Sequence, residues 1–188
     1  MMSPHAMPRR AVPIVLAMAV ALGAARPAAA GDSPPQEDPW APFRQLIGVW
    51  RGDAAGFGSV SDLQHEWDLA VQDRFLRLRT RSVQRTEDGE GEVHEDVGYL
   101  SFDTDRGAYV FRRFLSEGFV NTFDVAREGD AITFEARESE SAEGMRGRMV
   151  LTFEGEHDYG MVLELAGPGG DFAACQEMKL HRVKGGNE

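Results

Sequence analysis

FRQLIGVWRG, residues 43–52, is the stretch from which the fold can be predicted. Phe43, Leu46 and Ile47 lie on one side of a helix of one or two turns, and the proline directly before Phe43 is compatible with a first helical turn. From Gly48 onward the apolar residues recur at every second position, which is the period of a β-strand. We therefore predict a short helix that leads directly into the first of a series of strands.

The first thirty residues are predicted to be a secretory signal peptide. A basic start that ends in Arg9 and Arg10 precedes an apolar run of about fifteen residues, and three alanines before Gly31 offer a cleavage site. The run is shorter than the roughly twenty apolar residues of a membrane span, although an uncleaved N-terminal anchor is the alternative. We therefore predict a periplasmic or secreted protein with no membrane span after cleavage.

Residues 31–40 are polar and rich in proline, which predicts a flexible leader, and residues 41–185 predict a single domain. Without residues 1–30 the chain has 17 basic and 31 acidic residues, a net charge of −14. Such a charge repels phosphate backbones, so nucleic acid is not an expected partner. Cys175 is the single cysteine, so no internal disulfide can form and stability must come from packing.

Ten segments have the features of short antiparallel strands, which are typical of a β-sandwich or an up-and-down barrel. In DLQHEWDLAV the odd positions from Leu63 to Val71 are predicted to face a core and the even positions solvent. Residues 84–92 and 138–144 are acidic and predicted to be mobile loops, and the last segment also contains helix-favouring residues. The predicted strand cores are residues 48–56, 62–71, 74–83, 93–102, 108–115, 118–125, 131–137, 146–153, 158–165 and 172–183.

The helix that leads into Gly48-Val49-Trp50 resembles the entry of lipocalin-like, or calycin-like, barrels. There the helix closes one end and the tryptophan packs across the barrel floor, beside a glycine that permits close backbone approach. Residues 46–58 and 93–103 are also similar to motifs of nitrobindin-like barrels and of related exported barrels of unknown function. The resemblance implies an all-β, closed antiparallel up-and-down barrel of about ten strands with a short N-terminal plug helix.

Nitrobindin-like barrels bind haem through a histidine near the C-terminal strand. The matching region here, AGPGGDFAACQEMKL, contains no histidine. His181 follows it and is predicted to face outward with Cys175, Glu177 and Lys179. We therefore predict no cofactor, with haem as the alternative that the resemblance implies.

The remaining histidines differ in their predicted surroundings. His65 lies on the dry face between Leu63 and Trp67, where it could contact a ligand, act as an axial haem ligand, or be a hydrogen-bonded core histidine. His94 is expected to make a structural hydrogen bond at a strand start, and His157 to lie in a solvated turn. No two histidines have the spacing of a zinc site, so no metal is predicted.

Two arginine-rich segments pose the same choice between outside and inside. Arg77, Arg79 and Arg81 share one strand face, and we expect them to pair outside with an acidic neighbouring strand, although one could instead turn inward. In residues 109–115, Arg113 faces inward if Tyr109, Phe111 and Leu115 do. A buried arginine requires a partner or an anionic ligand, and its planar fork suits a carboxylate.

Catalysis has little support in the sequence. There is no Gly-x-Ser-x-Gly elbow, no phosphate loop and no dinucleotide fingerprint. Glu95 and Asp96 are adjacent, so on a strand they point to opposite faces and cannot act as a pair. An isomerase or hydrolase would need a titratable pair inside the barrel, and an enzyme is the less favoured interpretation.

We therefore predict an exported barrel that binds a small apolar or amphipathic molecule, fatty-acid-like or, by resemblance, haem. The alternative is a structural or envelope-interaction barrel whose own side chains fill the interior. Phe134 and Met149 are predicted to line the interior together with the ligand-binding residues. The predicted ligand-binding residues are His65, Trp67, Leu69, Phe111, Arg113, Phe123 and Met161.

Overall fold

The computed structural model describes residues 38–140 and 144–183, so the predicted signal peptide and most of the predicted leader lie outside the described residues. A 3-10 helix, η1 (Ala41–Leu46), precedes ten strands. The strands are β1 (Gly48–Gly56), β2 (Ser59–Ala70), β3 (Phe75–Thr86), β4 (Gly89–Asp103), β5 (Ala108–Leu115), β6 (Val120–Glu128), β7 (Ala131–Ser139), β8 (Arg146–Phe153), β9 (Asp158–Ala166) and β10 (Ala173–Arg182).

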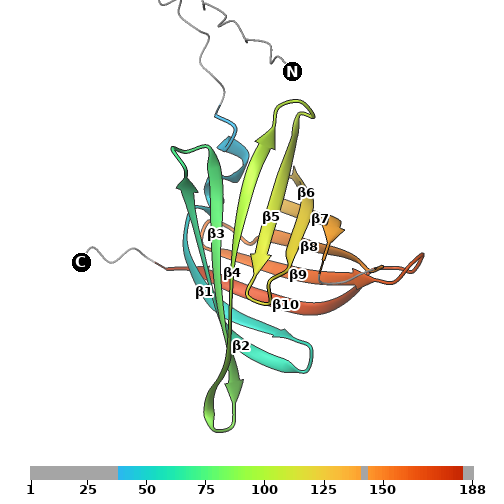
Figure 1. Cartoon of the computed structure of the whole chain (residues 1–188). Coiled ribbons are helices and arrows are strands. Elements are labelled where there is room, and N and C mark those ends of the chain that lie inside the picture. Colours follow the sequence, from blue (N-terminus) through green and yellow to red (C-terminus); the bar gives the residue numbers. More distant parts are fainter. Residues whose placement is uncertain (1–37, 141–143, 184–188) are drawn as a thin grey trace, which may run out of the picture. The chain divides into compact units, whose positions relative to one another are not determined.

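The strands form one closed antiparallel barrel (Figure 1). Each strand pairs with its neighbour in sequence, and β1 pairs with β10 to close the sheet. The predicted fold class is confirmed, and the C-terminal segment is a strand although part of its composition favours helix. Five hairpin turns lie at one end of the barrel, which we call the open end; η1 lies at the other, the plug end, because antiparallel strands alternate in direction.

The prediction of a loop over residues 84–92 is wrong. β3 continues to Thr86 and β4 begins at Gly89, so only a two-residue turn separates them, and the hairpin protrudes at the bottom of Figure 1. Both faces of this extension are solvated, so its sequence lacks the alternation that identified the other strands. Arg85 on this hairpin pairs with Asp53 on β1 and Asp62 on β2, and its positive charge offsets part of the charge of these two aspartates.

The prediction that Val71 belongs to the dry face of β2 is also wrong. β2 ends at Ala70, and Val71 lies in the following turn with a φ of 51° and an exposed fraction of 64%. The alternating pattern of residues 62–71 extends one residue beyond the end of the strand. The chain turns at Val71, so the Val71 side chain does not point into the core.

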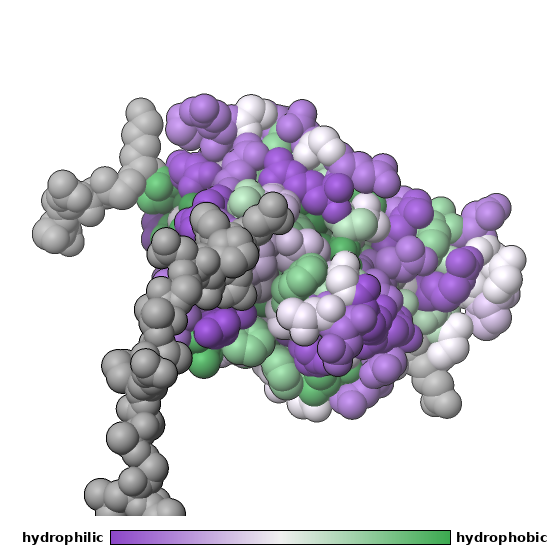
Figure 2. Space-filling model, turned by 90° about the horizontal axis from the view of Figure 1, so that it is seen from above, coloured by the Kyte–Doolittle hydropathy of each residue, from purple (hydrophilic) through white to green (hydrophobic). Residues whose placement is uncertain are grey.

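The predicted outer arginines are confirmed on β3. Arg77 forms an ion pair of 2.5 Å with Asp68, and Arg79 pairs with Glu66, both on β2. Arg81 lies 3.5 Å from a carboxylate oxygen of its register partner on β4, Glu95. Figure 2 shows hydrophilic residues over much of the face seen from above, with hydrophobic residues among them.

Trp50 closes the plug end of the barrel. Its side chain is completely buried, and its Nε1–H donates a hydrogen bond of 2.7 Å to the carbonyl oxygen of Leu46 in η1. The guanidinium of Arg182, the last residue of β10, lies 4.1 Å from the centroid of the Trp50 ring. It also donates to the carbonyl oxygens of Ile47 and Gln45, at 2.5 and 2.6 Å. One arginine thus joins the helix, the first strand and the last strand.

Gly48 makes this arrangement possible. Its φ is +135°, and a Cβ at this position would lie 2.7 Å from a guanidinium nitrogen of Arg182. Any larger residue would therefore displace Arg182 from Trp50 and adopt an unfavourable backbone conformation. The glycine and the tryptophan of the Gly-x-Trp motif thus both contact Arg182. The glycine leaves room for the guanidinium, and the guanidinium stacks on the tryptophan.

Further contacts fix η1 and the two residues before it against the barrel. Trp40 donates through Nε1 to the carbonyl oxygen of Asp73 at 2.8 Å, and Gln45 donates to that of Gly155 at 2.9 Å. The hydroxyl of Tyr109 donates to the carbonyl oxygen of Pro39 at 2.6 Å. The helix is therefore attached at several points around the barrel wall.

We expect Arg182→Lys to lower the free energy of unfolding by about 1–3 kcal/mol, because a lysine cannot donate to two carbonyls while it stacks on an indole. Urea denaturation followed by tryptophan fluorescence measures this change. Arg112→Lys, on the exposed face of β5, is the matched control and should change stability by less than about 0.5 kcal/mol. Equal midpoints for the two variants would contradict the role of Arg182.

Candidate functional site

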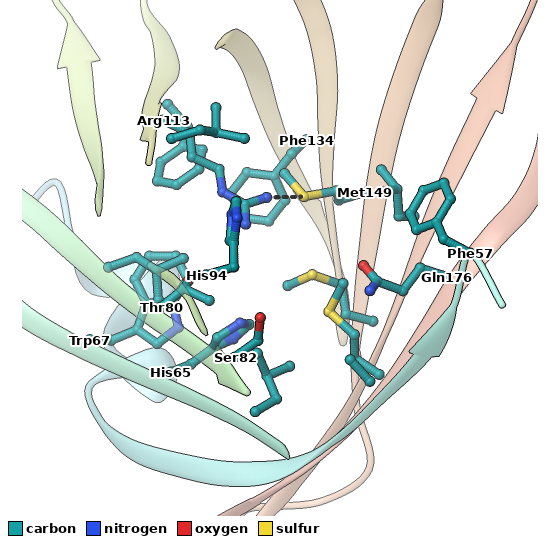
Figure 3. Close-up of a pocket in the computed structure, with 18 of the residues that line it drawn as sticks. Phe57, His65, Trp67, Thr80, Ser82, His94, Arg113, Phe134, Met149 and Gln176 are labelled. Carbon is teal, nitrogen blue, oxygen red and sulfur yellow. Dashed lines mark hydrogen bonds between the residues drawn. The ribbon is translucent and has the colours of Figure 1, made fainter. Parts of the chain in front are cut away.

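A cavity of about 360 Å³ lies inside the barrel, between the plug-end core and the open end. Its deep end is formed by Trp67 on β2, Leu78 on β3 and Phe111 on β5. At the open end Phe57, in the β1–β2 turn, and Gln176 on β10 line its rim. The cavity is visible in Figure 3, where side chains from opposite sides of the barrel point toward one another.

The two walls of the cavity differ in chemistry. Strands β2 to β5 and the turn after β5 supply most of the polar side chains and form what we call the polar wall, whereas β7 to β9 and Met178 on β10 form an apolar wall rich in methionine. In Figure 3 His65 and Thr80 lie on one side of the cavity and Met149 on the other. Because methionine is unbranched and flexible, the apolar wall can adapt to the shape of a ligand. The polar side chains of the polar wall are His65, Thr80, Ser82, His94, Arg113 and Glu117, and Leu63 and Leu115 lie among them. The apolar wall consists of Phe134, Met149, Met161, Leu163 and Met178.

Arg113 faces the interior, as predicted, and its partner is Asp96. The Nη2 group of Arg113 donates a hydrogen bond of 2.5 Å to Oδ2 of Asp96, whose side chain is completely buried. Burial raises the pKa of the Asp96 carboxyl, but the charge and hydrogen bonds of Arg113 and His94 outweigh it, so the pKa lies below its ordinary value. Burial lowers the pKa of Arg113 and Asp96 raises it, with a net increase. Both groups are therefore charged, and the pair is neutral as a unit.

His65 is buried, and its Nδ1 lies 2.6 Å from the hydroxyl of Tyr159 on β9. Burial and the nearby charge of Arg113 lower the pKa of His65 to about 4, although Asp96 acts in the opposite direction. The imidazole is therefore neutral at pH 7. This supports the hydrogen-bonded core histidine among the three alternatives, and the same side chain also lines the cavity.

His94 lies on the polar wall near the open end. Its Nδ1 is 2.9 Å from Oε1 of Glu117 and 3.2 Å from Oγ of Ser116, and its Nε2 is 3.6 Å from Oδ2 of Asp96. The carboxylate of Asp96 raises the pKa of His94, burial opposes this, and the charge of Glu117 adds to the increase. His94 thus makes its predicted hydrogen bond, with partners in the turn after β5, but it lies in the middle of β4 and beside the cavity and not at a strand start.

Four buried polar atoms on strands β2 to β5 have no hydrogen-bond partner within the described part of the chain: Nε1 of Trp67, Oγ1 of Thr80, Oδ1 of Asp96 and Nε of Arg113. Thr80 is opposite His65 in the β2–β3 register and opposite Asp96 in the β3–β4 register. A buried polar group without a partner costs about 1–3 kcal/mol. The polar wall therefore has hydrogen-bonding capacity that the protein itself does not use.

The structure brings together five of the seven predicted ligand-binding residues. Leu69 and Phe123 face inward but do not line the cavity. Leu69 lies one inward position closer to the plug end than Trp67, and Phe123 packs against Phe111, with ring centroids 6.0 Å apart. Alternation predicts which face a residue occupies but not its depth along the barrel axis. The five that line the cavity are His65, Trp67, Phe111, Arg113 and Met161.

Several polar residues of the site were not predicted as ligand contacts. Thr80, Ser82 and Gln176 line the cavity, and each lies at a position where alternation could have indicated an inward side chain. Gly98 is also part of the site, because a Cβ there would lie 2.1 Å from Cζ of Phe111. The Phe111 ring occupies the space that a side chain at position 98 would fill.

The described residues contain no cluster of three or more metal-ligating side chains. Within the same part of the chain, no helix has the length and apolar character needed to cross a bilayer. Haem fits the cavity poorly, since about 360 Å³ lies at the low end of the range for drug-sized ligands and a porphyrin is larger than such ligands.

Comparison with protein-family models and with curated proteins gives no match. Among solved structures, the crystal structure of Rv2717c from M. tuberculosis is similar, with a TM-score of 0.57, 17% sequence identity and coverage of 77% of this chain and 97% of that chain. At this identity the likeness shows the barrel fold alone.

Two further structures are similar with TM-scores below 0.5. A fluorescence-activating β-barrel designed de novo has a TM-score of 0.36 and 13% identity, over 73% of this chain and 93% of that chain. A protein of unknown function of the DUF3598 family from Nostoc punctiforme has a TM-score of 0.28 and 7% identity, over 77% and 98%. Neither adds to the functional assignment.

We expect acidification to destabilise the protein through His65. Its folded-state pKa of about 4 lies below the ordinary value of 6.5, so its contribution to stability is present above pH 6.5 and is lost as the pH falls towards 4. His65→Asn keeps a polar side chain that can hydrogen-bond to Tyr159 but cannot titrate. Between pH 7 and pH 4 the wild type should lose about 3 kcal/mol more unfolding free energy than this variant. Chemical denaturation at several pH values measures the difference, and parallel pH profiles would contradict the prediction.

Proposed function

We propose that this barrel is a binding protein that captures and releases a small apolar or amphipathic molecule. The observation that carries the proposal is the cavity of about 360 Å³, which is many times the roughly 30 Å³ that a water molecule occupies in the liquid. Ligand pockets are mostly apolar with a few placed polar groups, and the two walls have this composition. The alternative, a structural barrel filled by its own side chains, requires a packed interior.

Binding by this site needs no bond chemistry. The apolar wall and the rings of Trp67 and Phe111 would remove the apolar part of a ligand from water, at about 25 cal/mol for each Å² buried. Phe57 supports a route of entry, because it lines the rim and is 67% exposed. Its φ of 50° is unusual for a residue other than glycine, asparagine or aspartate.

The proposal includes export, on the basis of the signal-peptide pattern of residues 1–30. Haem is retained as an alternative ligand that the sequence resemblance suggests, and His65 and His94 are the histidines that line the cavity. The small volume of the cavity favours a ligand smaller than a porphyrin.

The neutral fluorophore N-phenyl-1-naphthylamine tests the proposal by titration of the protein expressed from the full sequence. We expect a saturable increase in emission with one site per barrel. Met161→Trp, which fills the apolar wall, should weaken binding by about tenfold or more, because a well-packed site tolerates added volume poorly. Val60→Trp places the same side chain on an exposed position of β2 and should leave the affinity unchanged.

Circular dichroism and thermal denaturation show whether each variant is folded, and Met161→Phe provides a milder filling variant. Absence of probe binding by the wild type, or equal binding by Met161→Trp, would support the structural barrel instead. A native mass spectrum of protein purified from haem-supplied cells distinguishes the ligands: a haem-mass adduct would replace the small-ligand proposal, and a smaller adduct would support it.

A further inference from the structure

The charge of Arg113 is already neutralised inside the barrel. Asp96 lies behind it, with a separation of 2.5 Å between Nη2 and Oδ2, and the aspartate side chain is not exposed. The Nη1 group points instead to the sulfur of Met149, at 3.7 Å, across the cavity in Figure 3. Arg113 therefore presents a hydrogen-bonding edge to the cavity but no net charge.

The other titratable groups of the polar wall do not supply a free cation either. His65 is neutral at pH 7 because its pKa is lowered to about 4, and His94 contacts two carboxylates, those of Glu117 and Asp96. A carboxylate ligand would therefore enter a site in which every described basic group already has an acidic neighbour or is uncharged. Burial of an uncompensated charge is strongly unfavourable.

Hydrogen-bonding capacity is nevertheless available. Thr80 lines the cavity, is 6% exposed, and its hydroxyl has no partner within the described residues. Nε of Arg113 is also unpaired there. A hydroxyl or amide group of a ligand could pair with Thr80 without any change in the charge of the site. The aromatic deep end and the methionine wall would contact a flat apolar body.

From this arrangement we infer that the cavity selects uncharged aromatic molecules that carry a hydroxyl or N–H group, and that Asp96 excludes carboxylates by acting as a permanent counter-ion of Arg113. The inference rests on the proposed binding function and specifies its ligand class. It also replaces the fatty-acid-like ligand expected from an inward arginine.

Three probes of similar shape test the inference by isothermal titration calorimetry at neutral pH: naphthalene, 2-naphthol and 2-naphthoate. In the wild type, 2-naphthol should bind at least about tenfold more tightly than 2-naphthoate, because only the latter brings an unmatched charge into the barrel. Thr80→Val should weaken 2-naphthol severalfold and leave naphthalene unchanged.

The decisive variant is Asp96→Asn, which keeps the shape of the side chain and removes its charge. It should raise the affinity for 2-naphthoate by about tenfold or more, because Arg113 then lacks a counter-ion. Asp124→Asn is the matched control, since Asp124 pairs with Arg106 and Arg137 on the outer surface. It makes the same change in net charge and should not alter any of the three affinities.

The possible outcomes separate the two proposals. Naphthalene binding without a preference for 2-naphthol over 2-naphthoate would overturn the ligand class and leave the binding function standing. A folded Asp96→Asn variant that gains no affinity for 2-naphthoate would overturn the role of Asp96. If Asp96→Asn fails to fold, the ligand class is tested by the wild-type preference for 2-naphthol over 2-naphthoate and by the affinities of Thr80→Val. No binding of any probe to the wild type would overturn the ligand class and the binding function together.

Discussion

The contact on which the rest of the structure depends is the stacking of Arg182 on Trp50. It connects η1, β1 and β10, three elements from the two ends of the domain, and it is possible only because Gly48 has no side chain. With this end closed by a buried tryptophan, the barrel interior is divided into a packed floor and the cavity above it. The packed floor therefore sets the depth of the cavity.

Above the floor, one side of the barrel interior is polar and the other side is apolar. The cavity-lining positions of β2 to β5 include most of the polar side chains, whereas those of β7 to β9 are aromatic, aliphatic or methionine. The polar half is internally compensated by Arg113 and Asp96, which explains how a barrel can contain an arginine without requiring an anionic ligand. The ligand class proposed above, with one hydrogen-bonding edge and one apolar face, matches these two halves.

The fold could be predicted from the sequence because aromatic and aliphatic residues alternate strongly along most strands, and because Gly48-Val49-Trp50 marks the plug. The same alternation correctly placed His65 and Arg113 inside. It failed where both strand faces are solvated, as in the β3–β4 hairpin. The pairing of Asp96 with Arg113 could not be predicted, because it depends on the β4–β5 register, in which Gly98 lies opposite Arg113.

Closure by β1 and β10 also has a consequence for how the chain folds. These strands are the first and the last of the domain, so the partners that pair across the seam are separated by most of its sequence, as Trp50 and Arg182 are. Contacts so distant in sequence carry a large loop-closure entropy and are associated with slow folding. The seam, with the stacked arginine at its end, can form only after the whole domain has been synthesised, so the barrel cannot be completed while its last strand is still missing.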